Sequence, residues 1–433
     1  MSRCLTRKTT MSSSSPYEII LTSSPDGPII AHDASSGAIL THFSDSRSPR
    51  RGLAVAGNTF IAASHISPTT ACGSIHLYNW WSSTAFHNLP VPEPVAPITA
   101  TSDGALIFAG GLSGCVYALS LPSGDILKSL PSHSKPVSCL GISDDGSLLV
   151  SGSDDGTIAV VPIFQLMGSS ENENSDYAIM QKFTAHSDSV TAIVFGSGLC
   201  TSQIISSSLD FTCKFWSLLR GTQLKTVSFR CGILGIVLDP TESEFYAAGS
   251  DGSVYKASIN AGSRELANPG HELVEWTEKH EGPVVSLAMV KEGRNLITAS
   301  EDGSVWVWDV ERGKVVIELG NTMGSMISDM VVAKGISYGK GHGSGAGSDG
   351  SGAGSGGGGS NNGSEEWRIG FCGEELMMGL GMKETMEMED VVRVAEKDRS
   401  RAIDMLESAI GMYEKLLELI LKEAKGQNGG GGQ

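Results

Sequence analysis

The feature of this sequence that most restricts its fold is a tight-turn signal that occurs seven times, each time followed by a segment of alternating apolar residues. The interval between signals is roughly 40 to 55 residues, a period typical of chains built from repeated β-sheet modules. Alternation at period two, interrupted by Gly- and Asp-containing turns, predicts short antiparallel strands. The seven turns are Asp26-Gly27, Cys72-Gly73, Ser113-Gly114, Asp155-Gly156, Asp210-Phe211, Asp251-Gly252 and Asp302-Gly303.

The positions six residues after these turns align with one another. They read His32-Asp33, Tyr78-Asn79, Leu119-Ser120, Val161-Pro162, Trp216-Ser217, Ala257-Ser258 and Trp308-Asp309. This register resembles the WD-repeat family, which places a Trp-Asp pair there. Only the last pair is intact, but seven segments in register indicate the family far more strongly than any one of them.

The resemblance implies a hydrogen-bond network in the best-preserved units. Its predicted members are His280, Ser300, Asp302 and Trp308 in the seventh unit, and His186, Ser208, Asp210 and Trp216 in the fifth. Such His, Ser and Asp sets could suggest catalysis, but buried polar groups must be paired, and a network that fixes a loop to its blade satisfies them. We therefore interpret them as structural. Units without the network, as at Val161-Pro162, should depend more on apolar packing.

The first unit has only three strands near its start, within residues 17–21, 28–31 and 38–41. The segment 325–332, which follows the seventh unit, can supply the fourth strand. Closing the ring in this way removes exposed sheet edges. The sequence thus predicts an all-β, seven-bladed WD-repeat propeller over residues 16–338, preceded by a disordered tail over residues 1–15. A transit peptide is the alternative for that tail, which has three basic and no acidic residues among many serines.

Composition restricts the kinds of partner. The formal net charge of −17 argues against a broad nucleic-acid surface, so any direct RNA contact would be local. The eight cysteines form no CxxC pair and no zinc spacing, which indicates free thiols and no metal site. No apolar run reaches the ~18–20 residues of a membrane span, and no cofactor motif stands out.

A second region follows the propeller. Residues 339–364 are almost entirely Gly and Ser, typical of a flexible linker. Residues 365–383 form a short irregular or strand segment, residues 384–425 a predicted coiled-coil helix, and residues 426–433 a tail. The helix has apolar positions at alternating steps of four and three. This seam comprises Val392, Ala395, Ala402, Leu406, Ala409, Tyr413, Leu416 and Ile420, with Arg399 interrupting it.

The predicted helix would span about 60 Å at 1.5 Å per residue. That is too long for the rim of one propeller, so we favour self-association or docking to a partner. A helix folded back along its own blades is the alternative.

Taken together, the chain resembles the WD-repeat subunit of the rixosome, a complex that matures pre-60S ribosomal particles, in its plant, root-initiation-defective type. The resemblance rests on residues 17–40, residues 74–90, residues 133–167 and the terminal helix. It implies a helical scaffold subunit as direct partner, an AAA-type ATPase and the pre-60S particle as partners through the complex, and homodimerisation through the C-terminal helix. It also implies a nuclear location, in nucleolus and nucleoplasm.

Two other function classes were considered. A substrate receptor of a ubiquitin ligase is a common use of WD propellers, but the sequence shows no adaptor-docking segment. An enzyme is disfavoured because no HExxH, GxSxG or GxxxxGK[ST] motif occurs. The sequence therefore favours a non-enzymatic scaffold in rRNA internal-transcribed-spacer processing, with the ligase receptor as alternative.

Overall fold

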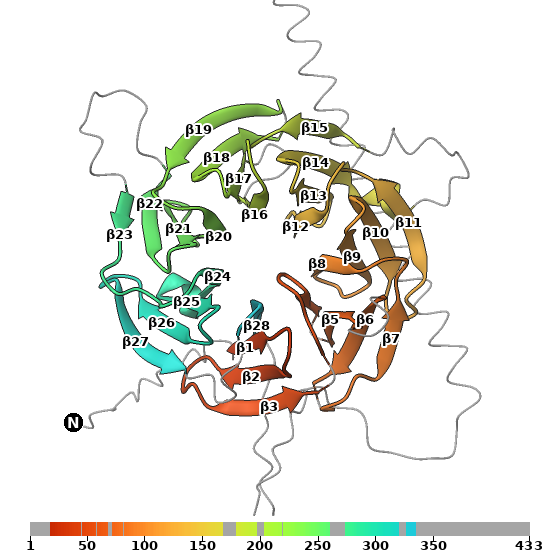
Figure 1. Cartoon of the computed structure of the whole chain (residues 1–433), viewed down its shortest axis with the longest axis horizontal. Helices are drawn as coiled ribbons and strands as arrows, with labels where there is room; N and C mark the ends of the chain where they lie inside the picture. The colour runs from red at the N-terminus through yellow and green to blue at the C-terminus, as the bar shows by residue number, and fades with distance from the viewer. Residues whose placement is uncertain are drawn as a thin grey trace, which may run out of the picture. The chain divides into compact units, whose positions relative to one another are not determined.

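The computed structural model describes residues 18–44, 46–57, 59–67, 72–80, 82–167, 179–196, 203–218, 220–259, 273–319 and 326–334. Within them, seven four-stranded antiparallel sheets stand as blades around a common centre (Figure 1). This confirms the predicted all-β, seven-bladed propeller. The predicted N-terminal tail, linker, coiled-coil helix and seam residues lie outside the described residues.

Blades 1 to 4 follow one another around the ring. Blades 2 to 4 have their strands in sequence from the centre outward, whereas the innermost strand of blade 1 is β28. Blade 1 consists of β28 (Asp329–Lys334), β1 (Glu18–Ser23), β2 (Ile29–Asp33) and β3 (Ile39–Phe43). Blade 2 consists of β4 (Leu53–Ala56), β5 (Phe60–Ile66), β6 (Gly73–Asn79) and β7 (His87–Pro90). Blade 3 consists of β8 (Val95–Ala100), β9 (Leu106–Gly111), β10 (Cys115–Ser120) and β11 (Ile126–Pro131). Blade 4 consists of β12 (Val137–Ile142), β13 (Leu148–Ser153), β14 (Thr157–Pro162) and β15 (Gln181–Thr184), with the short helix α1 (Ile163–Met167) before β15.

Blades 5 to 7 complete the ring in the same pattern. Blade 5 consists of β16 (Val190–Phe195), β17 (Gln203–Ser208), β18 (Thr212–Ser217) and β19 (Thr222–Ser228). Blade 6 consists of β20 (Ile233–Leu238), β21 (Glu244–Gly249), β22 (Val254–Ser258) and β23 (Leu273–Glu275). Blade 7 consists of β24 (Val284–Val290), β25 (Asn295–Ser300), β26 (Val305–Asp309) and β27 (Lys314–Leu319), with a single 3₁₀ turn (Lys291–Gly293) after β24.

The ring closes where the two ends of the propeller sequence meet. Strand β28 pairs antiparallel with β1 over six residue pairs, from Glu18 opposite Lys334 to Ser23 opposite Asp329. In Figure 1 these two strands, from opposite ends of the propeller sequence, lie side by side. The predicted closure by a strand from residues 325–332 is therefore confirmed, and the strand itself begins at Asp329.

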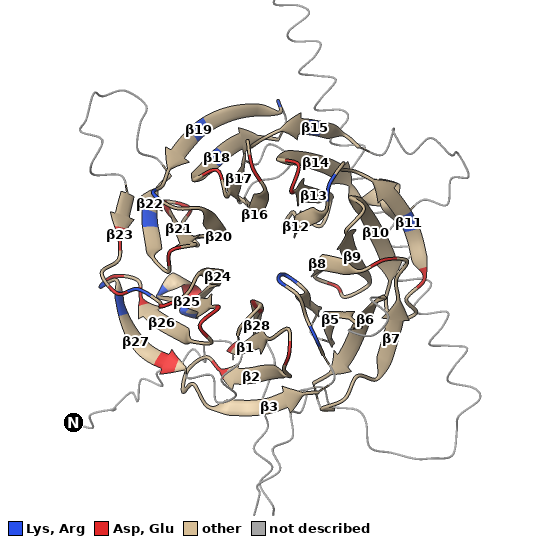
Figure 2. Cartoon of the chain, viewed as in Figure 1, with Lys and Arg blue, Asp and Glu red and all other residues tan. Residues whose placement is uncertain are grey.

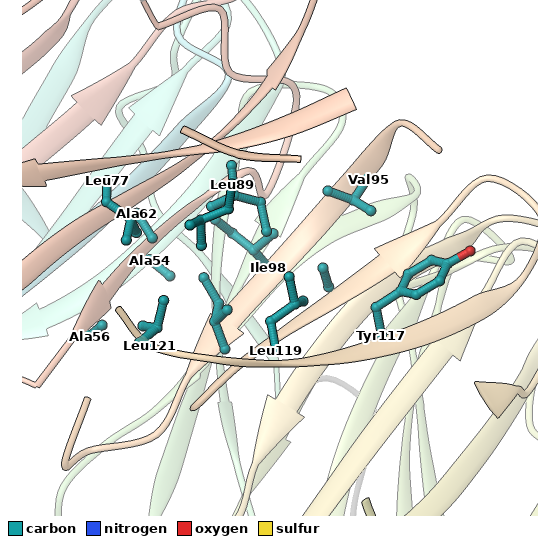
Figure 3. Packing of buried hydrophobic residues seen from close by; sticks show 13 residues of the cluster. Ala54, Ala56, Ala62, Leu77, Leu89, Val95, Ile98, Tyr117, Leu119 and Leu121 are labelled. Atoms are coloured by element: carbon teal, nitrogen blue, oxygen red, sulfur yellow. The ribbon is translucent and has the colours of Figure 1, made fainter. Parts of the chain in front are cut away.

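The apolar core lies between neighbouring blades. One cluster joins Ala62, Leu77 and Leu89 of blade 2 to Ile98 and Leu119 of blade 3, and all five are at most 6% exposed (Figure 3). Successive residues of a strand point to opposite faces, so each blade offers an apolar face to both neighbours. The second strands of the blades, such as β9 and β13, are thus buried along their whole length, whereas outer strands such as β27 alternate exposed and half-buried positions.

Candidate functional site

The fifth blade contains a chain of buried hydrogen bonds. His186 Nδ1 lies 2.9 Å from Asp210 Oδ2, and His186 Nε2 lies 2.8 Å from Ser206 Oγ. The Trp216 Nε1–H donates to the same Ser206 oxygen at 2.9 Å. A carboxylate only accepts, so the His186 Nδ1 carries the proton and Nε2 accepts from Ser206. The network therefore connects the loop before β16, the turn after β17 and the strand β18.

The seventh blade has a similar arrangement, in which a hydroxyl and not the carboxylate is the direct partner of the histidine Nδ1. The His280 Nε2 lies 2.7 Å from Thr298 Oγ1, which also accepts from the Trp308 Nε1–H at 2.9 Å. On its other side, His280 Nδ1 contacts Ser304 Oγ at 2.7 Å, and this hydroxyl donates to Asp302 at 2.5 Å. Asp302 also accepts from the backbone N–H of Glu281, so it holds the loop before β24 in place.

The prediction that Ser208 and Ser300 supply the hydroxyl between the histidine and the tryptophan was wrong. Trp216 is paired across the sheet with Ile204, so the nearest hydroxyl on its face is two residues along, at Ser206. Ser208 is four residues along, about 13 Å away at ~3.3 Å per residue. Its hydroxyl instead accepts from the Asp210 N–H at 3.0 Å. The seventh blade repeats this shift, with Ser300 bound to the Asp302 N–H at 3.3 Å.

The fourth blade also has a network, contrary to the expectation drawn from Val161-Pro162. Its His133 contacts Thr157 Oγ1 and Ser151 Oγ, each at 2.8 Å. Asp155 accepts from the Thr157 hydroxyl at 2.6 Å and from the backbone N–H of Ser134. Only the Trp is missing, replaced by the buried Val161. The 22-residue interval from His133 to Asp155 equals that from His280 to Asp302, so this spacing was the signal that could have revealed it.

The sixth blade replaces the network with aromatic packing. Phe229 occupies the position of the histidine, four residues before the first residue of the inner strand β20. Its ring packs edge-on against Tyr255, with centroids 5.4 Å apart. The Tyr255 hydroxyl donates to Asp251 at 3.2 Å. The turn aspartate is thus retained without a histidine beside it.

Burial keeps the network histidines neutral. It lowers the pKa of His133 and of His280 to about 4, and it lowers the pKa of His186 as well, although the nearby carboxylates oppose the shift. Burial alone would raise the pKa of Asp155, but hydrogen bonds from Thr157 and Ser134 hold it well below its usual range. Neutral imidazole and ionised carboxylate are therefore the resting states near pH 7.

These lowered pKa values predict a loss of stability in mild acid. The unfolded chain has histidine pKa values of about 6.5 and so binds more protons than the folded chain between roughly pH 4 and 6.5. Each of His133, His186 and His280 should lower the free energy of unfolding by up to about 1.4 kcal/mol per pH unit as the pH falls through this range. Asp329, whose pKa burial raises to about 6, acts in the opposite sense. His32, whose pKa burial also lowers, adds to the effect of these three histidines, so the net slope should equal about three histidines.

Urea unfolding at about pH 7.5, 6 and 5 measures this slope. Replacing His280 by Gln should reduce this slope by the equivalent of roughly one proton, independently of how much the substitution lowers the free energy of unfolding at pH 7.5. A stability that does not change between pH 7.5 and 5 in the unmodified chain would contradict the assignment.

A second polar cluster lies where the ring closes. The Ser328 hydroxyl donates to the Ser48 carbonyl oxygen at 2.7 Å and lies 3.1 Å from the Ser23 hydroxyl. The buried Asp329 carboxylate accepts from the Leu53 N–H at 3.2 Å. The closing strand β28 is thereby bonded both to β1 and to blade 2. This cluster stabilises the junction of the two ends.

Two arginines of the loop before β4 reach toward the middle of the ring. Figure 2 shows a basic loop tip there, beside β8 and β28. Arg51, partly buried, donates from its guanidinium to the Leu234 carbonyl oxygen of blade 6, and Arg50 pairs with Glu301 of blade 7. Burial lowers the pKa of Arg51, while Asp329 acts against that shift. The loop thus connects blade 2 to the far side of the ring.

The hydrogen bonds of these polar groups have a structural role. The Ser206 and Thr298 hydroxyls would be the nucleophiles of a catalytic interpretation, but both residues are 0% exposed and already hydrogen-bonded to Trp and His. In the part of the chain that the structure describes, no group of three or more His, Cys, Asp or Glu residues could hold a metal ion. No helix among the described residues is long and apolar enough to cross a membrane.

Seven sheets in a closed ring, with His–Asp networks at the turns of blades 4, 5 and 7, define a WD-repeat β-propeller. The sequence matches the WD domain, G-beta repeat, at residues 124–160, 178–217 and 272–309, which lie in blades 3 to 7. It is 36% identical over 308 residues to Protein ROOT INITIATION DEFECTIVE 3 of Arabidopsis thaliana, covering 71% of this chain and 69% of that relative. The chain belongs to the family of WD-repeat proteins that includes this relative, as the resemblance in its sequence indicated.

More distant relatives extend the family beyond plants. WD repeat-containing protein 18 of Bos taurus is 26% identical over 283 residues, covering 64% of this chain and 63% of the relative. The pre-rRNA-processing protein crb3/ipi3 of Schizosaccharomyces pombe is 22% identical over 313 residues, covering 65% of this chain and 69% of the relative.

Proposed function

We propose that this protein is a non-enzymatic scaffold subunit of the rixosome, acting in maturation of pre-60S ribosomal particles and in processing of the rRNA internal transcribed spacer. The main support is family membership, because relatives across fungi carry the name pre-rRNA-processing protein. The propeller agrees with this role, since its buried His, Ser and Asp side chains hydrogen-bond to one another and hold the blades together. Its exposed turns and edges remain for binding other proteins.

The partners follow from the same proposal. The propeller binds a helical scaffold subunit, and the assembled complex associates with an AAA-type ATPase and the pre-60S particle. The protein works in the nucleus, mainly the nucleolus, and in the nucleoplasm. The segment 384–425 pairs two copies through its apolar seam.

Depletion of the protein tests the ribosomal role. We expect precursors that still contain the internal transcribed spacer to accumulate several-fold on RNA blots, because a missing scaffold stalls the particle before the spacer is removed. Re-expression of the full chain should restore normal levels. Unchanged spacer-containing precursors, or co-purification with cullin adaptors in place of ribosomal particles, would overturn the proposal.

The homodimer is tested on the purified full chain and on a chain ending at residue 338. The native mass should fall about twofold on truncation, beyond the mass of the residues removed. A monomeric full chain would refute the seam while leaving the ribosomal role untouched.

A further inference from the structure

The turn between β17 and β18 has a phenylalanine at a position where the equivalent turns of other blades have glycine. Phe211 has φ +67°, in the left-handed region that disfavours a bulky side chain. At the same position blades 3, 4 and 6 have Gly114, Gly156 and Gly252, with φ of +89°, +76° and +87°. A β-carbon at any of these three glycines would lie 2.3 Å from a carbonyl oxygen of the following loop. Blade 5 therefore keeps a side chain where its neighbours have no room for one.

The side chain kept at this strained position faces solvent. Phe211 is 52% exposed, and Leu209, two residues earlier in the same turn, is 37% exposed. Left-handed geometry in a non-glycine residue costs roughly 1–2 kcal/mol, and an exposed ring recovers little of it by burial within the chain. Strained residues of this kind cluster at functional sites, and aromatic side chains are the commonest anchors of protein interfaces.

The surroundings of this turn are acidic on the side toward blade 4. The Leu209 N–H donates to the Ser189 carbonyl oxygen at 3.2 Å, and the Ser189 hydroxyl donates to Asp154. Asp188, immediately before Ser189, is exposed. Two carboxylates, Asp154 and Asp188, therefore border the apolar pair and are not neutralised by any ion pair within the described residues.

One cation lies on the opposite side. The Phe229 N–H donates to the Phe211 carbonyl oxygen at 2.8 Å, which places Arg230 next to the turn. The Arg230 side chain is 88% exposed and directed toward Glu275 of blade 6, at 4.0 Å. Arg230 is thus paired with a carboxylate of blade 6, whereas Asp154 and Asp188 have no ion pair within the described residues.

We propose that Leu209 and Phe211 form a docking point for a partner segment that carries an apolar side chain next to Lys or Arg residues. The apolar side chain packs on the Phe211 ring and Leu209, while the cations meet Asp154 and Asp188. An exposed apolar contact bordered by opposite charges gives both affinity and orientation. This inference rests on the proposed scaffold role, which gives the reason why the protein would need a docking point.

The test uses the purified full chain and three fluorescein-labelled octapeptides: a basic one with the sequence GKRLLKRG, its acidic counterpart GEDLLEDG, and GKRSSKRG without the apolar pair. Fluorescence anisotropy should show binding of the basic apolar peptide and at least tenfold weaker binding of the other two. Raising the salt from about 50 to 300 mM should weaken the binding several-fold, because Asp188 is exposed and Asp154 is only partly buried.

Two variants of the protein separate docking from folding. Phe211→Gly should weaken the basic apolar peptide at least tenfold and leave the melting temperature unchanged or raised, since glycine relieves the backbone strain. The matched control is Leu224→Ser on the outer strand β19 of the same blade, which removes a side chain of similar exposure, 51%, and should bind as the unmodified chain does.

Several results would overturn the proposal. They are no binding at 1 mM peptide, equal binding of the acidic peptide, or binding unchanged by Phe211→Gly. A fall in native mass caused by Phe211→Gly would identify a second copy of this chain as the occupant instead. None of these outcomes affects the rRNA measurement, so the two proposals can fail separately.

Discussion

A chain that ends at Leu319 should lose cooperative folding, whereas a chain that ends at Lys334 should keep it. The difference between them is the segment that contains β28. In it Ile327, Met330 and Ala333 are each at most 3% exposed, and burying a side chain of Ile or Met size contributes about 1.5–3 kcal/mol. With the bonds of Ser328 and Asp329, the loss is on the order of 5 kcal/mol or more, against a total stability of about 5–15 kcal/mol. Thermal unfolding followed by circular dichroism measures it.

The shorter chain also exposes an edge. Without β28, the backbone groups of β1 that pair with it face solvent, and an unpaired edge invites aggregation. A synthetic peptide of residues 326–334 added to the shorter chain should occupy that edge and raise its melting temperature. Equal melting temperatures for the two chains would show that closure contributes little, and would contradict the role given to β28.

The architecture was accessible from the sequence because its signals are local and repeated. A turn such as Asp302-Gly303 fixes where one strand ends and the next begins, and the alternation on either side sets which face is buried. Seven such units leave one blade short of a strand, so closure by residues from beyond the seventh unit follows from counting. None of these inferences requires information about contacts between residues that are distant in the sequence.

The details of the networks were less accessible because they depend on register across the sheet. The choice between Ser206 and Ser208 is decided by Trp216 pairing with Ile204, which no single strand reveals. The Arg51 contact with Leu234 joins residues 183 positions apart, and its loop carries no motif. The strained backbone of Phe211 is likewise visible only in three dimensions, although the absence of glycine at that turn marks the position in the sequence.

Replacing Thr298 by Val should destabilise the protein by about 2–4 kcal/mol, while replacing Ser300 by Ala should cost only about 0.5–1 kcal/mol. The Val side chain keeps the shape of Thr298 but leaves the Trp308 N–H without an acceptor and the His280 Nε2 without a donor. Both groups are buried, and an unsatisfied buried group costs roughly 1–3 kcal/mol. Ser300 contributes one weak bond to the Asp302 N–H at 3.3 Å. Urea denaturation of the two variants gives the comparison directly.

The pair in blade 5 provides an independent control for this ranking. There the structure predicts that Ser206→Ala costs more than Ser208→Ala, because Ser206 bridges the buried His186 and Trp216 side chains. Ser208 bonds only backbone groups, accepting from the Asp210 N–H and donating to the Asp188 carbonyl oxygen at 3.3 Å. If the sequence-based assignment to Ser208 and Ser300 were right, the order would be reversed in both blades. The same ranking in two blades would therefore locate the hydroxyl by its cross-strand distance from the tryptophan, and the reversed ranking in either would refute that register.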